Sequence, residues 1–324
     1  MNVPRVALNN GAEMPQVGLG CWKIPKDVVG NLVYEAIKSG VRHLDCACDY
    51  GNEVEVGHGV KRAIDEGIVT RADLWITSKL WNTYHAKEHV RMACEKSLSD
   101  MGVDYFDLYL IHFPICLKYV PFEVAYPPEW MFPGEGKIVQ SPVPYHETWM
   151  AMEELVKAGL AKSIGTCNIM CQQLMDILSY CTITPAVNQV EMHPYLTQQS
   201  LVDYCKSVGI HITAFSPLGS SSYIELGMDG GKGTGALNEP VVKAVAAEVG
   251  RTAAQVVLRW GVQRGVSIIP KSSKAERIVE NFSLFDFELS DAQMESITAL
   301  NANQRFNDPG VFCVGMGGSI PIYG

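Results

Sequence analysis

The chain has 324 residues, of which 47% are hydrophobic, and its 26 lysines and arginines against 35 aspartates and glutamates give a formal net charge of −9. A disordered chain would hold less apolar material, and an acidic balance without basic runs argues against a nucleic-acid or anionic-membrane surface. No apolar run approaches the roughly 18 residues that span a bilayer, and the first residues lack a signal-type segment. These properties predict a soluble, cytoplasmic globular protein.

The predicted elements begin with a small hairpin and continue as an alternation of strands and helices. Residues 3–15, with the turn sequence Asn9-Asn10-Gly11, are expected to form the hairpin. Short apolar or β-branched runs then predict strands at residues 17–22, 43–47, 75–80, 108–113, 163–168, 186–191, 211–216 and 266–271. Apolar residues at spacings of three and four predict helices at residues 28–38, 54–66, 89–101, 147–157, 172–180, 198–208, 240–249 and 251–263. Several of these helices end at a glycine, which suits a C-cap: Gly40, Gly102, Gly159, Gly209 and Gly250.

The fold class follows from this alternation. Each strand run is almost continuously apolar, as expected for parallel strands that are covered on both faces. Eight such strands with crossover helices close most simply into a (β/α)8 TIM barrel, so we expect an α/β fold in which residues 1–324 form one domain. Three segments are additional to the eight strand–helix units: the hairpin, a proline- and aromatic-rich loop at residues 114–144 and a glycine-rich tail from residue 301.

A polar or amphipathic residue stands at the C-terminal end of every predicted strand, where functional groups collect in this fold. These residues are Trp22, Asp45, Lys79, His112, Asn168, Gln189, Ser216 and Lys271. A lone Asp or Lys in such a place is often half of a structural ion pair, so no single residue carries the interpretation. The pattern at all the ends together predicts an active site.

Four residues near three neighbouring strand ends can act together as a proton donor. Tyr50 follows Asp45 by five residues, and Lys79 and His112 end the next two strands. A phenol with a pKa of about 10 is a poor acid at neutral pH, but a nearby ammonium lowers that pKa and an aspartate can hold the ammonium in place. A histidine beside the phenol can orient a carbonyl oxygen. The chain has no GxSxG motif for a serine nucleophile and no second strand-end carboxylate for glycoside hydrolysis.

The cysteines and histidines do not predict a metal site. The ten cysteines include no CxxC pair, and the eight histidines include no HxH or HExxH spacing. Because no secretion signal accompanies the cysteines, they are expected to be reduced thiols rather than a disulfide framework.

Five stretches, at residues 43–61, 76–82, 108–114, 185–196 and 269–281, resemble the aldo-keto reductase superfamily. The similarity runs over nearly the whole chain and keeps the order and spacing of the motifs. The resemblance implies a (β/α)8 barrel and NADPH-dependent reduction of a carbonyl group. It also implies that the catalytic tetrad is Asp45, Tyr50, Lys79 and His112, with the tyrosine as general acid.

The same resemblance implies where NADPH (as NADP⁺ after oxidation) binds. Asn168 and Gln189 would hold the nicotinamide carboxamide, and Phe215 would stack on the ring, beside Trp22. The other implied contacts are Ser216, Leu218 and Ser220 for the pyrophosphate, Lys271, Ser272 and Arg277 for the adenosine 2′-phosphate, and Glu280 and Asn281 near the adenine. An ammonium, a hydroxyl and a guanidinium match a dianionic phosphate well.

Other positions bear on coenzyme choice. Ser273 stands where dual-coenzyme xylose reductases carry Asn, and Glu225 matches a carboxylate that can reach the ribose hydroxyls of NADH. We therefore expect NADPH to be preferred, with measurable activity with NADH.

The glycine-rich segment at residues 227–235 is expected to be a flexible flap over the coenzyme. The chain departs from the family pattern at Cys167, where serine is usual, which removes one hydroxyl contact to the carboxamide.

Within the superfamily, the loop at residues 112–136 and the RFNDP sequence at residues 305–309 resemble the xylose and aldose reductases. This resemblance implies that Asp49 and Asn307 contact sugar hydroxyls. The rest of the implied substrate pocket is His112 with the rings of Trp22, Trp81 and Phe113. Without the resemblance, Asp49 would be interpreted as a solvent-exposed charged residue in a loop, and Asn307 as a turn residue before Asp-Pro.

The expected substrate is a small aldehyde, with an aldose such as xylose favoured, and three alternatives stay open. A sugar-phosphate reductase would need a basic residue near the pocket, for which Lys23 and Lys118 are the candidates. General reduction of aldehydes such as methylglyoxal would use the same tetrad. A redox-sensing regulatory subunit would bind NADPH but turn over slowly. The only expected partner is the small-molecule substrate, for a chain that is a monomer or a homodimer.

Overall fold

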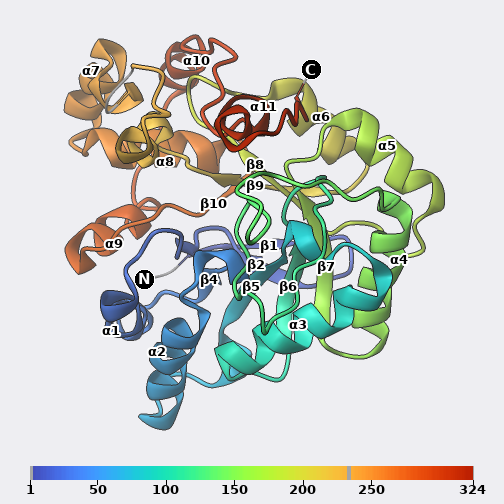
Figure 1. The fold of residues 1–324 in the computed structure, drawn as a ribbon. Helices are drawn as coiled ribbons and strands as arrows, with labels where there is room; N and C mark the ends of the chain where they lie inside the picture. The colour runs from blue at the N-terminus through green and yellow to red at the C-terminus, as the bar shows by residue number, and fades with distance from the viewer. Residues whose placement is uncertain (1–2, 232–234, 324) are drawn as a thin grey trace.

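Parallel strands form the centre of the protein and close on themselves. A computed structural model describes residues 3–231 and 235–323, and within them eight strands pair in chain order, each with the next along the chain (Figure 1). The strands are β3 (Leu19–Gly20), β4 (His43–Asp45), β5 (Trp75–Leu80), β6 (Phe106–Ile111), β7 (Ala161–Cys167), β8 (Val187–Glu191), β9 (His211–Phe215) and β10 (Ser267–Ile268). A parallel bridge joins Val17 to Ile268, and the amide of Gly18 donates to the Ile268 carbonyl at 2.9 Å. The first and last strands therefore meet, and the predicted (β/α)8 barrel is confirmed.

Helices cover the outside of the barrel (Figure 1). Those that the sequence predicts are α1 (Lys26–Lys38), α2 (Glu53–Asp65), α3 (Lys87–Met101), α4 (Tyr145–Lys157), α5 (Cys171–Tyr180), α6 (Gln199–Ser207), α7 (Pro240–Val249) and α8 (Ala253–Gln263). The glycines expected at helix ends have positive φ, for example 67° at Gly102, directly after α3. A side chain at such a position would be strained, which explains why glycine ends the helix there.

Three helices that the sequence analysis does not predict are α9 (Ala275–Phe282), α10 (Asp291–Thr298) and the short α11 (Pro309–Phe312). A start signal for α10 is present in the sequence. The Ser290 hydroxyl accepts from the Gln293 amide, and the Gln293 side chain accepts from the Ser290 amide at 2.9 Å. This is the reciprocal capping box that Ser-x-x-Gln predicts.

The fourth barrel strand begins two residues earlier than its apolar run suggests. β6 starts at Phe106 rather than at residue 108, so a charged residue, Asp107, lies inside it. The Asp107 carboxylate accepts hydrogen bonds from Arg71 at 2.8 Å and from the Ile76 amide at 3.0 Å. These bonds compensate the burial of the charge, which pattern reading alone does not foresee.

The N-terminal hairpin covers one end of the barrel. Its strands are β1 (Arg5–Ala7) and β2 (Glu13–Pro15), which pair antiparallel as predicted. Met14, which is fully buried, packs there with Trp75, Leu108 and Val187 from the starts of three barrel strands. The N-terminal mouth of the barrel is thereby filled, and the C-terminal ends of the strands are left for the functional site.

A long loop and the C-terminal tail lie together at the other end of the barrel. Residues 114–144 contain no helix or strand in the structure apart from a bridge between Leu117 and Gln140. The Ile138 amide of this loop donates to the Met316 carbonyl of the tail at 3.0 Å.

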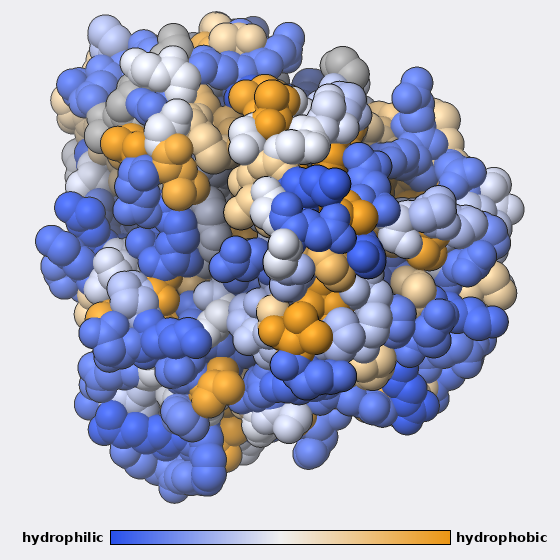
Figure 2. All heavy atoms as spheres, in the orientation of Figure 1, coloured by the Kyte–Doolittle hydropathy of each residue, from blue (hydrophilic) through white to orange (hydrophobic). Residues whose placement is uncertain are grey.

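The face of the molecule in Figure 2 is mostly hydrophilic, with hydrophobic side chains in small separate groups. Among the described residues, no helix has the length and apolar character that crossing a membrane requires.

Candidate active site

A cavity of about 990 Å³ opens at the C-terminal ends of the barrel strands. Almost all residues that the sequence analysis assigns to a site line it. They are Trp22, Asp45, Asp49, Tyr50, Trp81, His112, Phe113, Asn168, Gln189, Phe215, Ser216, Leu218, Glu225, Lys271, Ser272, Ser273, Arg277, Glu280, Asn281 and Asn307. The exceptions are Lys79, which lies beneath the cavity floor, and Ser220, which is fully buried, while Ser221 lines the cavity nearby.

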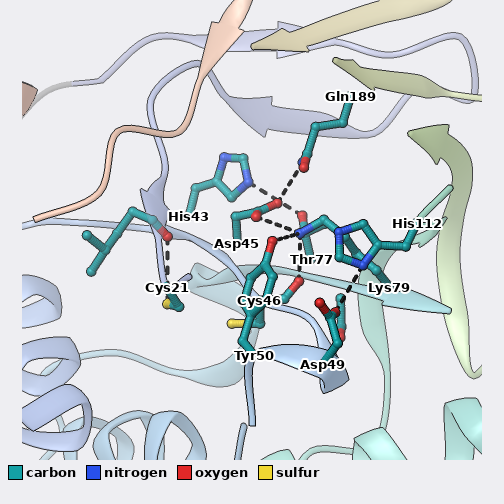
Figure 3. A network of polar contacts seen from close by, with 12 residues as sticks. Cys21, His43, Asp45, Cys46, Asp49, Tyr50, Thr77, Lys79, His112 and Gln189 are labelled. Atoms are coloured by element: carbon teal, nitrogen blue, oxygen red, sulfur yellow. Dashed lines mark hydrogen bonds and ion pairs between the residues drawn. The ribbon is translucent and has the colours of Figure 1, made fainter. Parts of the chain in front are cut away.

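The buried ammonium of Lys79 is the centre of a polar network below this cavity (Figure 3). Its Nζ atom lies 2.7 Å from Asp45 Oδ1, 2.8 Å from the Cys46 carbonyl and 3.0 Å from the Tyr50 hydroxyl. Gln189 donates to the other Asp45 oxygen, Oδ2, at 2.7 Å. Lys79 lies on β5 next to β4, and the 3-10 turn Cys48–Tyr50 that follows β4 brings the phenol back over it. Pairing of neighbouring strands therefore positions the whole group.

The pKa of Tyr50 differs from the sequence-based expectation. Burial raises it well above its ordinary value, and the Lys79 ammonium only partly offsets that effect. The expected lowering by the ammonium is present, but burial outweighs it, and the sequence does not reveal how fully the phenol is desolvated. The hydroxyl is protonated throughout the neutral range.

Lys79 itself is held charged by its neighbours. Burial disfavours the ammonium, but the Asp45 carboxylate and the Tyr50 phenol outweigh burial, and the pKa of Lys79 is raised well above its ordinary value. A phenol that loses its proton beside this ammonium forms an ion pair in a site with little water, where charge interactions are strong. The network therefore stabilises a tyrosinate, should one form.

His112 and Asp49 lie beside the phenol. The Nδ1 atom of His112 is 3.0 Å from Asp49 Oδ1, without the angles of a hydrogen bond, and the rings of His112 and Tyr50 meet edge to face. Trp81 meets the His112 ring at 5.5 Å between centroids and the Trp130 ring at 5.2 Å. A carboxylate, an imidazole and a phenol thus share an otherwise aromatic end of the cavity.

Asn168 and Ser216 lie at strand ends with backbone in the left-handed region, at φ 59° and 47°. Such φ values cost energy for residues with a side chain and gather at functional sites. The Asn168 amide is held at both ends, since its Nδ2 donates to the His112 carbonyl at 2.9 Å and its Oδ1 accepts from Tyr323 at 2.8 Å. The strain is therefore used to aim two polar side chains at the cavity.

The far end of the cavity is basic. Lys271, Ser272 and Arg277 lie where β10 passes into α9. Burial, together with the nearby Lys23, lowers the pKa of Lys271. The positive charges of Lys23 and Lys271 repel one another, so an anion bound between them would be stabilised. Lys23 also forms an ion pair with Glu225 across the cavity.

Several cavity residues are absent from the sequence-based site. Among them are Trp130, Tyr223, Phe312 and Met316, and also Lys23, which the sequence analysis names only as a candidate for the sugar-phosphate alternative. The aromatic composition of the 114–144 loop and of the tail was the available signal for Trp130 and Phe312.

Lys118 lies outside the cavity and pairs with Glu135 at 3.4 Å. Of the expected flap at 227–235, residues 232–234 lie outside the described residues, and Met228 lines the cavity.

Comparison with known proteins gives a consistent result. The model of the Aldo/keto reductase family matches residues 14–302. A probable NAD(P)H-dependent D-xylose reductase of Aspergillus clavatus is 52% identical, with 95% of this chain and 94% of the relative covered. An NADPH-dependent aldose reductase of Saccharomyces cerevisiae is 50% identical, with 94% and 95% covered.

Solved structures agree with this comparison. The aldose reductase of Schistosoma japonicum matches with a TM-score of 0.83 at 39% identity, covering 94% of both chains. A Bombyx mori aldo-keto reductase in complex with NADP matches with a TM-score of 0.85 at 36% identity, covering 96% of both chains.

Proposed function

The chain belongs to the aldo/keto reductase family, and from this premise we propose that it reduces the open-chain aldehyde of an aldose such as xylose, with NADPH as the preferred coenzyme. It is an NAD(P)H-dependent oxidoreductase that acts on a small-molecule carbonyl compound. We further propose that it is a single-domain cytoplasmic enzyme, a monomer or homodimer. The free cysteines, seven of them buried, are in keeping with a reducing compartment.

The contact between Lys79 and Tyr50 carries the proposal. The Tyr50 hydroxyl donates its proton to the carbonyl oxygen of the substrate as that oxygen gains negative charge. Lys79, 3.0 Å from the phenol oxygen, stabilises the tyrosinate that remains, and Asp45, 2.7 Å from Nζ, keeps Lys79 charged and in place. Because burial raises the pKa of Tyr50, the proton stays on the phenol until a better acceptor arrives.

His112 and Asp49 would orient the carbonyl group. Since His112 turns Nδ1 toward Asp49, the opposite ring nitrogen, Nε2, is the one that can donate to the substrate oxygen beside Tyr50. Trp81 and Phe113 pack around His112 and exclude water from this end of the cavity. An aldehyde held there has its oxygen between an imidazole and a phenol.

The described residues fit the proposed coenzyme. Asn168 and Gln189 are buried at the cavity floor with polar side chains that suit a carboxamide, and Phe215 and Trp22 are ring surfaces in the same cavity. Lys271, Ser272 and Arg277 at the other end suit a phosphate dianion. When bound, NADPH supplies the hydride that reduces the carbonyl carbon.

Charge favours an unphosphorylated aldose over a sugar phosphate. Among the described residues, Lys23 pairs with Glu225 near Lys271, at the coenzyme end, and Lys118 pairs with Glu135 outside the cavity. At the substrate end, Asp49 and Asn307 are the polar groups placed to meet hydroxyls.

A steady-state panel of xylose, mannose 6-phosphate, glyceraldehyde and methylglyoxal would rank the substrates. A kcat/KM highest for mannose 6-phosphate would replace the aldose assignment.

The acid is tested by Tyr50→Phe. The variant should bind NADPH with unchanged affinity and lose about 10²- to 10⁴-fold in glyceraldehyde reduction, since only the proton donor is gone. Tyr84→Phe is the matched control, because Tyr84 is a buried phenol outside the cavity. Reduction within tenfold of the wild type in the Tyr50 variant would remove Tyr50 from the mechanism.

A further inference from the structure

A fully buried carboxylate that the proposed mechanism does not use stands at the end of β8. Glu191 follows Gln189 by two residues on this strand, so the two side chains point to the same face of the sheet. Gln189 lines the cavity, whereas Glu191, which is closer to the C-terminal end of the strand, does not. A buried carboxylate needs hydrogen-bond donors around it, so the identity of those donors indicates what Glu191 does.

Two of these donors are consecutive main-chain amides of the C-terminal tail. The Phe306 amide donates to Glu191 Oε1 at 2.9 Å, and the Asn307 amide donates to Oε2 at 2.8 Å. His193 Nε2, in another fully buried side chain, lies 2.9 Å from Oε1. One carboxylate thus holds, with one oxygen each, two adjacent residues that lie 115 and 116 positions later in the chain.

The tail meets the cavity at the point where Glu191 holds it. Just before this point, the amides of Ala302 and Gln304 both donate to the Tyr195 carbonyl, at 3.1 and 3.0 Å, so the approach of the tail is also bonded to the loop after β8. Asn307 is the first residue of the tail that lines the cavity. The bonds to Glu191 therefore fix the main chain from which the Asn307 side chain extends into the site.

We propose that Glu191 is a positioning residue for substrate selectivity, which seats the tail so that the Asn307 side chain reaches a sugar hydroxyl. The inference rests on the proposed function, because it concerns how the pocket distinguishes hydroxylated aldehydes from others. A hydrogen bond needs its partners within a narrow range of distances, so a tail displaced by about 1 Å would lose the contact. An aldehyde without hydroxyl groups makes no such contact and loses less.

The kinetic test is a double-mutant cycle of Glu191→Gln and Asn307→Ala. Glutamine keeps the volume, but its NH2 group would face a tail amide donor to donor, so one of the two bonds is lost. The ratio of kcat/KM for xylose to that for an unhydroxylated aromatic aldehyde should fall roughly three- to tenfold, mainly through the KM for xylose. The double variant should lose no more of this ratio than Asn307→Ala alone, since Glu191 acts through Asn307. Additive losses, or equal losses on both substrates, would overturn the proposal.

Glu153→Gln is the matched control. Glu153 is also a buried carboxylate that accepts from two consecutive amides, those of Thr182 at 2.7 Å and Ile183 at 2.9 Å, but it lies on α4 and does not line the cavity. The same kind of bond is lost in another part of the molecule, so the selectivity ratio should stay unchanged. A fall equal to that of Glu191→Gln would mean that general loosening alters selectivity, and would overturn the proposal.

Amide hydrogen exchange tests the seating of the tail without turnover. The Phe306 and Asn307 amides should be protected in the wild type and exchange at least about tenfold faster in Glu191→Gln, while Glu153→Gln should leave their rates unchanged. Exchange of these two amides in the wild type at the rate of an unstructured peptide would refute the proposal even if the Glu191 variant did not fold. Equal protection in the wild type and in Glu191→Gln would refute it as well. A wild-type enzyme that does not reduce xylose would refute the proposed substrate class instead, because the exchange pattern would be unaffected.

Discussion

Glu53, a carboxyl group buried between α2, β5 and α3, predicts a stability that falls as the pH rises. It begins α2, its side chain is 4% exposed, and it accepts a hydrogen bond from Ser78 at 2.6 Å and another from Ser97. Burial raises the pKa of Glu53 from 4.5 to about 7, although the two hydroxyl groups pull it down. The folded protein therefore holds a proton on this group that the unfolded chain has already released.

The magnitude follows from the two pKa values. Between 4.5 and about 7, each pH unit is worth about 1.36 kcal/mol, so the full effect approaches about 3 kcal/mol. For an acid whose folded pKa is raised, the unfolded state binds fewer protons in this window, and stability declines as the pH increases. The contribution is complete below the unfolded pKa and is lost by the time the pH has passed the folded pKa. From pH 5 to pH 8 the loss amounts to about 2.5 kcal/mol.

Glu53→Gln should remove this dependence, because glutamine keeps the volume and can donate to one serine and accept from the other. Urea unfolding at pH 5 and pH 8 would measure the difference between wild type and variant, and the ¹³C shift of the carboxyl group would report its titration directly. Glu153→Gln is the opposite control. Hydrogen bonds from Thr182, Ile183 and Trp149 outweigh burial and lower the pKa of Glu153, so this variant should lose most stability at neutral pH. A Glu53 carboxyl that titrates below pH 5 would refute the reasoning.

Three further predictions concern ligand binding. Lys271→Met or Arg277→Met should raise the KM for NADPH at least about tenfold and leave that for NADH within a few-fold, because only the phosphate contact is lost; equal changes would indicate a general role in holding adenosine. Asp49→Ala should weaken turnover of an aldose more than that of an aromatic aldehyde, and equal losses would leave Asp49 as an orienting partner of His112 alone. Tyr323→Phe should raise the KM for NADPH roughly threefold at unchanged kcat, since Tyr323 holds the Asn168 amide; an unchanged KM would contradict this.

The barrel could be predicted from the sequence because its strands and helices have distinct apolar periods. The strand ends then place Asp45, Lys79 and His112 on neighbouring strands without any coordinates. The start of β6 was missed because Asp107 interrupts the apolar pattern, and only its bonds to Arg71 and to the Ile76 amide make that charge acceptable inside a strand. A partner so distant in the chain leaves no local signal.

The parts of the site that the sequence did not reveal depend on burial and on loops. Whether burial or Lys79 dominates the pKa of Tyr50 is decided by how fully water is excluded, which no local pattern encodes. The difference between Ser220 and Ser221 depends on the rotation of one 3-10 turn, Gly219–Ser222. Tyr223 could not be assigned to the cavity, because the tail residue Phe306 packs on its ring only when the tail folds back over the barrel.

The meeting of the first and last strands has a consequence for biosynthesis. The amides of Gly18 and Gly20 bond to the carbonyls of Ile268 and Pro270, and the Gln16 side chain donates to the Val266 carbonyl. A nascent chain that has not yet released these last residues from the ribosome carries a sheet with two open edges, each able to pair with another chain. The barrel cannot close until the residues through Pro270 have left the ribosome. We therefore expect truncations before Ile268 to aggregate rather than to form a smaller stable fold.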